Sequence, residues 1–208
     1  MSAQNRHEPL WEQIPEGLEP PDFPRRRGFL LAHVSAGQRV LDLGCGEGHF
    51  AQVLGAAGAI VTAADVASEP LRRAQRRVAG LPVRLLPGEP PWPLPDAGFD
   101  AVWAGEVAEH VDDTSAWLSE VRRVLRSGGR LLMSTPDHGP LSTASMALRP
   151  HLFDRHFDPR SDHLRFYTRR TLRTLLNDFA FEAIAIRAVG GVPGARRTLL
   201  ASATRMRF

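Results

Sequence analysis

The stretch RVLDLGCGEG, residues 39–48, decides the fold that this sequence predicts. Its first half has the length and apolar composition of a buried strand, and it runs into a Gly-x-Gly-x-Gly turn at residues 44–48. Apolar residues then recur at helical spacing from Phe50 to Ala57. A strand, a glycine turn and a helix in this order are typical of a βα unit whose bare backbone lies against a ligand.

Outward from this unit, short apolar strands alternate with amphipathic helices, which predicts an α/β fold built on a parallel sheet. Residues 87–95 hold five prolines and should form an irregular loop. Asp113 and Thr114 offer N-cap side chains to a helix that Gly128 and Gly129 should end. The expected strands are residues 39–43, 59–64, 83–86, 99–104, 130–135, 181–187 and 198–204, the last two forming an antiparallel hairpin.

The composition excludes several chemistries. All 26 positive charges in the 208 residues are arginines, so there is no lysine for a Schiff base, for pyridoxal phosphate or for a Walker A loop. Cys45 is the only cysteine, which excludes an intramolecular disulfide and a cysteine zinc cluster and fits a reducing compartment. No apolar run is long enough to span a bilayer. We therefore expect a cytoplasmic protein without a membrane partner.

The charge is unevenly distributed along the chain. Residues 1–138 hold 14 arginines against 18 acids, whereas residues 139–208 hold 12 arginines against 5 acids. One interpretation is that the basic part faces a substrate. The alternative is that heavy arginine use without lysine reflects genomic base composition. The acidic part is expected to carry the core chemistry.

Three regions are expected along the chain: an arm at residues 1–24, a single domain at residues 25–208, and a lid or substrate-binding insertion at residues 137–167. The arm is rich in Pro, Glu and Gln, with one helical turn expected around Trp11. The insertion interleaves histidines, aromatics and arginines, which predicts stacking on a planar or anionic acceptor; a solvated loop is the alternative. These residues are His151, His156, His163, Phe153, Phe157, Phe166, Tyr167, Arg149, Arg155, Arg160 and Arg165.

The glycine turn disfavours a dinucleotide. A Gly-x-Gly-x-x-Gly fingerprint needs glycine where His49 stands, and the third glycine comes one residue early at Gly48. Asp65 lies 21 residues after Gly44, where a carboxylate can accept hydrogen bonds from ribose hydroxyls. Asp42 adds negative charge beside the turn, which suits a cationic cofactor and opposes a pyrophosphate. S-adenosylmethionine has both the ribose and the positive charge.

With these residues in view, the chain resembles the class I S-adenosylmethionine-dependent methyltransferases, in the broad group that includes ubiquinone-pathway O-methyltransferases. The likeness covers roughly residues 38–188 and is carried by five motifs in the family's order. They are VLDLGCGEG (40–48), Asp65, PDAGFD (95–100), GEVAEHV (105–111) and RVLRSGG (123–129).

The resemblance implies a Rossmann-like seven-stranded sheet of order 3-2-1-4-5-7-6, with one antiparallel strand and helices on both faces. It also implies S-adenosylmethionine as the cofactor. The segment GEPPWP, residues 88–93, departs from the family pattern by being one residue shorter and filled with proline. Cys45 is expected to pack in the cofactor loop and not to act as a nucleophile. The implied cofactor-binding residues are Asp42, Gly44, Cys45, Gly46, Asp65, Val66, Glu89, Gly105 and Glu106.

Two interpretations remain open for the segment after the fourth strand. Glu106, Glu109 and His110 stand at i, i+3 and i+4, so on a helix they share one face. In the first interpretation His110 is a general base that Glu109 orients. In the second, these three residues and His163 bind a divalent metal that lowers the pKa of the acceptor.

A second, partial resemblance bears on the metal. TPD (135–137) and DHLRFYTR (162–169) are similar to the small-RNA 3′-end 2′-O-methyltransferases, which implies such a metal and an RNA acceptor. The favoured function is methyl transfer to a small-molecule acceptor, anionic or aromatic, with oxygen favoured over nitrogen or carbon. The alternatives are an RNA 2′-O-methyltransferase with a divalent metal, a nicotinamide-dependent oxidoreductase, and a non-catalytic cofactor-binding partner protein.

Overall fold

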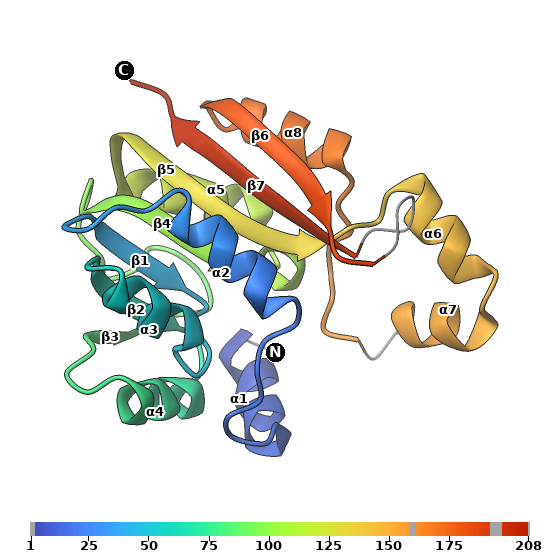
Figure 1. Ribbon diagram of the computed structural model, residues 1–208, viewed down its shortest axis with the longest axis horizontal. Helices are drawn as coiled ribbons and strands as arrows, with labels where there is room; N and C mark the ends of the chain where they lie inside the picture. The colour runs from blue at the N-terminus through green and yellow to red at the C-terminus, as the bar shows by residue number, and fades with distance from the viewer. Residues whose placement is uncertain (1–2, 159–160, 192–196, 208) are drawn as a thin grey trace.

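The computed structural model describes residues 3–158, 161–191 and 197–207, without the side chains of residues 3–6, 152, 155 and 156. Its centre is one seven-stranded sheet of order β3-β2-β1-β4-β5-β7-β6 (Figure 1), which confirms the expected topology. β7 runs antiparallel to both of its neighbours, and β1 to β5 are parallel. The strands are β1 Arg39–Leu43, β2 Ile60–Asp65, β3 Val83–Leu85, β4 Phe99–Gly105, β5 Leu125–Pro136, β6 Phe181–Val189 and β7 Thr198–Arg205.

Helices cover both faces of the sheet (Figure 1). One core cluster joins α5 and α8 to one face, and a second joins α2, α3 and α4 to the other. Alternate strand residues serve the two clusters: Leu41 and Leu43 of β1 belong to the first and Val40 to the second. The helices are α1 Ala3–Gln13, α2 Phe23–Leu31, α3 His49–Ala56, α4 Ser68–Arg77, α5 Thr114–Val124, α6 Pro140–Ala147, α7 Pro150–His156 and α8 Arg169–Asp178, with a 3₁₀ turn η1 at Ala108–His110.

The parallel register brings four strand ends to one edge of the sheet. Leu43 pairs with both Ala64 and Ala104, and Gly105 pairs with Ser134. The carboxyl ends of β1, β2, β4 and β5 therefore lie side by side, and the loops that follow them share one space. In open α/β sheets this edge is where ligands bind.

The α5–β5 boundary differs from the sequence expectation. α5 begins at Thr114 with Asp113 as its N-cap, as expected, but it ends at Val124 and not at the glycine pair. The reason is that Leu125 already pairs with Phe99 of β4 across an irregular register, so the backbone leaves the helix to join the sheet. Gly128 instead takes the left-handed backbone, φ +71°, within β5.

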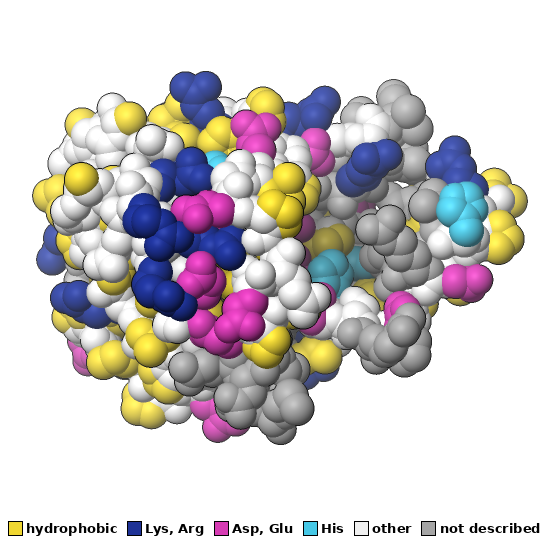
Figure 2. Space-filling model, turned by 90° about the horizontal axis from the view of Figure 1, so that it is seen from below, with side chains coloured by type: hydrophobic (Ala, Val, Ile, Leu, Met, Phe, Trp, Pro, Cys, Tyr) yellow, Lys and Arg dark blue, Asp and Glu magenta, His cyan; other side chains and the backbone are white. Residues whose placement is uncertain are grey.

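The arm and the insertion both contain helices. α1 occupies much of the expected arm, extends well beyond the one helical turn expected around Trp11, and contacts α4. The insertion folds its first part into α6 and α7, which project from the body of the molecule (Figure 1). The view in Figure 2 shows arginine and carboxylate side chains intermixed on the side of α4 and α1. Among the described residues, no helix has the length and hydropathy needed to cross a membrane.

Candidate active site

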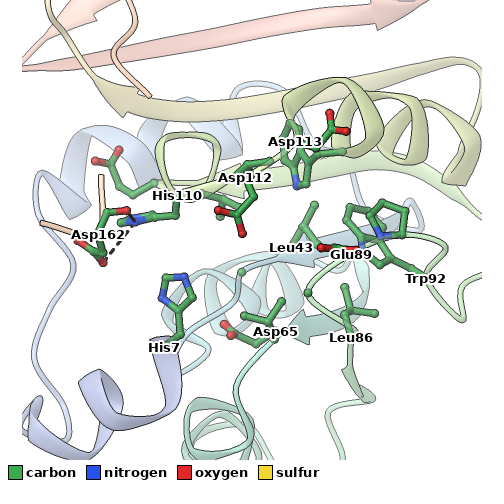
Figure 3. Close-up of a pocket in the computed structure, with 18 of the residues that line it drawn as sticks. His7, Leu43, Asp65, Leu86, Glu89, Trp92, His110, Asp112, Asp113 and Asp162 are labelled. Atoms are coloured by element: carbon green, nitrogen blue, oxygen red, sulfur yellow. Dashed lines mark hydrogen bonds and ion pairs between the residues drawn. The ribbon is translucent and has the colours of Figure 1, made fainter. Parts of the chain in front are cut away.

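A cavity of about 520 Å³ opens at the carboxyl edge of β1, β2 and β4. Its volume lies in the range of cofactor pockets. Side chains from the strand ends form one side and α1 forms another, so segments far apart in the sequence meet there (Figure 3). The lining residues include His7, Leu10, Trp11, Ile14, Leu43, Gly44, Asp65, Val66, Leu86, Glu89, Trp92, Glu106, Val107, His110, Asp112, Asp113, Trp117 and Asp162.

The glycine turn needs its glycines for both backbone conformation and space. Gly44 (φ +68°) and Gly46 (φ +52°) adopt the left-handed conformation that side chains disfavour. A Cβ at Gly44 would collide with the Val107 side chain, and one at Gly46 would stand 2.9 Å from the Trp11 indole. The turn is tied to the neighbouring strand because the Gly44 and Cys45 amides donate to the Ala64 carbonyl at 2.8 and 3.0 Å.

Asp65 fastens the same turn from the end of β2. Its Oδ2 accepts from the Gly46 amide and its Oδ1 from the Ala67 amide, both at 3.1 Å. Each oxygen accepts only one of these bonds and has a second lone pair, so the carboxylate can also accept ribose hydroxyls from the cavity that it lines. Burial raises the pKa of Asp65 above its ordinary value, and the two amides oppose the rise.

Asp42 lies behind the turn and does not line the described cavity. It is fully buried, and burial raises its pKa to about 7, with the nearby Asp65 carboxylate adding to the rise. Its Oδ2 has no hydrogen-bond partner among the described residues. The charged form of Asp42 is therefore costly in this buried position.

The remaining cofactor candidates divide into two sets. Val66, Glu89 and Glu106 line the cavity, whereas Cys45, Gly46 and Gly105 do not. Cys45 is buried in the core cluster of α3, and burial raises the pKa of its thiol, which keeps the sulfur protonated. The Arg26 and Trp103 side chains pack so closely against Gly105 that a Cβ at this position would collide with both. Gly105 therefore allows close packing at the end of β4 and is not part of the cavity wall.

Glu106, Glu109 and His110 do not share a helical face, contrary to the sequence expectation. Glu106 has φ +58°, and only the short turn η1 follows it, so the Glu106 side chain is separated from those of Glu109 and His110. Ser134 Oγ donates to Glu106 Oε1 at 2.7 Å, and Thr135 Oγ1 donates to Glu109 Oε2 at 3.0 Å. Glu106 thus lines the cavity, whereas Glu109 is fully buried.

His110 lies beside Asp162 of the insertion, at the end of the cavity opposite Glu89 and Trp92 (Figure 3). Its Nδ1 lies 3.0 Å from the Asp162 carbonyl and 3.3 Å from the Asp162 carboxylate. Both partners are acceptors, so Nδ1 carries the proton and Nε2 is left with its lone pair. Burial lowers the pKa of His110, the Asp162 carboxylate opposes this fall, and the neutral ring can accept a proton.

Three of the four metal candidates come together. One possible ligand atom each from Glu109, His110 and His163 lies within 4.8 Å of the others, while Glu106 is outside this group. Glu109 Oε1 is buried and has no hydrogen-bond partner among the described residues. Burial, reinforced by the Glu106 charge, raises the pKa of Glu109 well above its ordinary value. An unpartnered carboxylate oxygen beside two imidazoles fits a divalent cation.

Sequence reasoning missed two contributors, both from the amino-terminal region. Arg26 is 2% exposed, with its guanidinium 4.7 Å from the Phe50 ring centre, and it provides positive charge to Glu106 and Glu109. Its sequence context is a run of three arginines, which is indistinguishable from a solvated face. His7 lines the cavity with its ring centre 5.5 Å from that of His110, and no local pattern marks it.

The insertion contributes less of the wall than its composition indicated. Of its described residues only Asp162 lines the cavity. The last part of the insertion is held against the 3₁₀ turn η1, because the Leu164 and Arg165 amides donate to the Glu109 carbonyl at 2.7 and 3.0 Å. Arg160 and the side chains of Arg155 and His156 lie outside the described residues.

The fold and the cavity define a class of protein: a Rossmann-like α/β domain that binds its ligand at the carboxyl edge of the sheet, beside a glycine turn. Residues 41–133 match the family described as "Methyltransferase domain". This match covers just under half of the chain and agrees with the class I S-adenosylmethionine-dependent methyltransferases that the motifs resemble.

Known proteins similar to this chain differ in their named acceptors. A malonyl-[acyl-carrier protein] O-methyltransferase of Erwinia pyrifoliae is 38% identical over 121 residues, which are 57% of this chain and 45% of that protein. A ubiquinone biosynthesis O-methyltransferase of Xanthomonas oryzae is 36% identical over 128 residues, 58% of this chain and 53% of that one. The chain spans about half the length of the curated relatives it matches.

A solved structure shares the fold over nearly the whole chain. Phosphoethanolamine N-methyltransferase 2 of Haemonchus contortus, in complex with S-adenosyl-L-methionine, has a TM-score of 0.72 at 16% identity. The match covers 99% of this chain and 58% of that one.

Proposed function

We propose that this protein transfers the methyl group of S-adenosylmethionine to a small-molecule acceptor, with oxygen favoured as the acceptor atom. The observation that carries the proposal is Asp65, which holds the glycine turn through Gly46 and faces the cavity with further acceptor capacity. That arrangement suits the ribose of an adenosyl group. Two O-methyltransferases among the similar proteins support oxygen as the acceptor atom.

The two ends of the cavity suit the two substrates. Leu86, Glu89 and Trp92 gather at one end, where an apolar wall and a carboxylate suit adenine (Figure 3). His110 and Asp162 stand at the opposite end with His7, which leaves that end for the acceptor. Glu106 also lines the cavity, and its negative charge suits the cationic part of the cofactor.

Methyl transfer is an in-line displacement at a sulfonium that is already activated, so the protein has to align the acceptor and take up one proton. His110 Nε2 is the acceptor for that proton because Nδ1 is committed to Asp162. As the imidazole becomes charged, the Asp162 carboxylate at 3.3 Å stabilises it. Glu109 acts from beneath the turn through its backbone contacts and does not orient the ring directly in this structure.

The experiment is a methyl-transfer assay with labelled S-adenosylmethionine on a panel of phenols, hydroxy acids, amines and RNA 3′ ends. We expect labelled product from the phenols or hydroxy acids. Labelling confined to amines would overturn oxygen as the acceptor atom, and a panel without any labelled product, in a protein that binds the cofactor, would favour the non-catalytic alternative.

A second candidate is a metal-dependent version of the reaction, and the grouping of Glu109, His110 and His163 favours it. A divalent cation held by these residues would lower the pKa of an acceptor hydroxyl. Its test is calorimetric titration with Mn²⁺ and an assay in EDTA. Binding of Mn²⁺ that His163→Ala abolishes, with activity lost in EDTA and restored by Mn²⁺, supports the metal. Activity unchanged by EDTA excludes it. A ribose 2′-hydroxyl at an RNA end is the acceptor to test in that case.

A further inference from the structure

The helix α1 is attached to the rest of the protein at its middle and at its carboxyl end. At its middle, the Glu8 carboxylate accepts hydrogen bonds from the Ser68 amide, the Ser68 hydroxyl and the Glu69 amide at 2.6, 2.6 and 3.0 Å. These amides belong to the first turn of α4, where unpaired N–H groups and the helix dipole favour a carboxylate. The bond from Ser68 holds the pKa of Glu8 below its ordinary value, so the carboxylate is ionised at neutral pH.

The carboxyl end of α1 and the residue that follows it are held by a buried arginine of α4. Arg73, 7% exposed, donates to the carbonyls of Trp11 and Ile14 at 2.8 and 2.9 Å. The same guanidinium is fixed by Glu47 and Glu69, each at 2.8 Å. Glu47 in turn belongs to the glycine turn, so the attachment of α1 and the shape of the cofactor loop share one charged network.

α1 also closes one side of the cavity. His7, Leu10 and Trp11 of α1 line it together with Ile14, which follows the helix, and the Trp11 indole lies directly over Gly46. A cofactor in the cavity would therefore lie between the strand ends and this helix. α1 is poorly suited to stand alone, because it has eleven residues and Pro9 removes one of its backbone hydrogen bonds.

We propose that α1 is a latched lid over the S-adenosyl cofactor, with Trp11 as the side chain that contacts the bound adenosyl group and Glu8 as the latch to α4. This inference rests on the proposed function for the identity of the cofactor. The latch makes no contact with the acceptor, so its loss should weaken cofactor binding without altering the strand-end residues. Exchange of the cofactor then requires α1 to leave α4.

The test is calorimetry with S-adenosylhomocysteine on the full chain. Glu8→Ala and Trp11→Ala should each raise the Kd at least about tenfold, since the first removes three charge-assisted hydrogen bonds and the second the contact itself. Glu8→Gln keeps an acceptor oxygen and should fall between Glu8→Ala and the wild type. Glu12→Ala is the matched control, because Glu12 is an exposed glutamate of the same helix, and it should leave the Kd unchanged.

Hydrogen exchange gives a second measurement that does not depend on activity. In the wild type, S-adenosylhomocysteine should slow exchange of the α1 amides, and Glu8→Ala should remove most of that protection while core strands keep theirs. Unchanged affinity in Glu8→Ala and Trp11→Ala, with α1 exchange insensitive to S-adenosylhomocysteine, would overturn the lid and leave the proposed function standing. A wild type that binds no S-adenosylhomocysteine would overturn both.

Discussion

The two ends of the cavity are built differently. At the cofactor end, beside β1 and β2, the backbone of the glycine turn sets the shape. The buried Asp65 carboxylate, at the end of the neighbouring strand β2, holds this turn by accepting a hydrogen bond from the Gly46 amide. At the acceptor end, beside β4 and β5, side chains set the shape. His110 depends there on Asp162, which is 52 residues further along the chain.

This difference bears on function. A backbone-built end has few degrees of freedom and suits a ligand that does not vary, such as a common cofactor. A side-chain-built end is fixed by distant segments of the chain, so the insertion can change without disturbing the turn. The same sheet edge can thus serve different acceptors, and substitutions at the two ends should give separable effects on binding and on turnover.

The largest expected effect is loss of cofactor binding in Gly46→Val. The added side chain must adopt a left-handed backbone and displace Trp11, so we expect the affinity for S-adenosylhomocysteine to fall by at least about 100-fold in calorimetry. Gly80→Val is the matched control, because Gly80 has a similar φ of +73° and open space around it. Equal losses in both variants would mean that backbone strain, and not the shape of the turn, explains the result.

The next effect separates the two ends. His110→Ala should lower the turnover rate by about 10²–10⁴ and leave the affinity for S-adenosylhomocysteine nearly unchanged, because the proton acceptor is lost at the acceptor end. Initial rates with the acceptor identified by the panel would measure it, with His151→Ala, an exposed histidine of α7, as the control. A rate unaffected by His110→Ala would leave positioning of an already nucleophilic acceptor as the explanation.

A smaller effect is expected at the cofactor end itself. Asp65→Ala removes a charge-assisted hydrogen bond to the ribose, worth about 1.5–3 kcal/mol, so the affinity for S-adenosylhomocysteine should fall by about 10- to 100-fold. Thermal melting without ligand checks the fold, because Asp65 also accepts the Gly46 and Ala67 amides. An unchanged affinity would refute its assignment to the ribose.

The smallest effect is on stability and depends on pH. The pKa of Asp42 rises from 3.8 to about 7 in the folded protein, so the folded state binds the proton more tightly than the unfolded chain. Its contribution to stability is therefore greatest below about pH 4 and is lost as the pH rises towards 7. Asp42→Asn does not titrate, and its Tm should exceed that of the wild type at pH 8 by at least about 2 °C, with a smaller gap at pH 5.

Asp100→Asn gives the opposite sign and serves as the control for Asp42. The Arg126 guanidinium, 2.6 Å away, holds the pKa of Asp100 below its ordinary value, so its contribution is present above that range and lost on acidification. Asp100→Asn should lower the Tm at pH 8. Parallel shifts in the two variants would contradict the burial argument for Asp42.

Most of the sheet could be predicted from the sequence because its signals are local. The strand before the glycine turn, the proline-rich loop at residues 87–95 and the Asp113 cap all lie where the patterns placed them. The end of α5 could not be predicted in this way, since pairing of Leu125 with Phe99 overrides the glycine signal. Family resemblance, and not periodicity, supplied the strand order.

The site was predictable only where backbone geometry builds it. The spacing from the glycines to Asp65 follows from one βαβ unit, so that juxtaposition could be read from the chain. The spacing of Glu106, Glu109 and His110 was misleading because Glu106 breaks the helix with a positive φ. His7 and Arg26 were missed because their roles come only from tertiary contacts with the sheet edge.

The most direct test of the central claim is a pair of calorimetric titrations of the wild-type protein, one with S-adenosylhomocysteine and one with NADH. The account predicts one S-adenosylhomocysteine site with a Kd in the micromolar range, about −8 kcal/mol, and no heat of binding with NADH. Saturable binding of NADH together with no binding of S-adenosylhomocysteine would contradict it, because the cavity beside Asp65 would then hold a nicotinamide cofactor and not an S-adenosyl group.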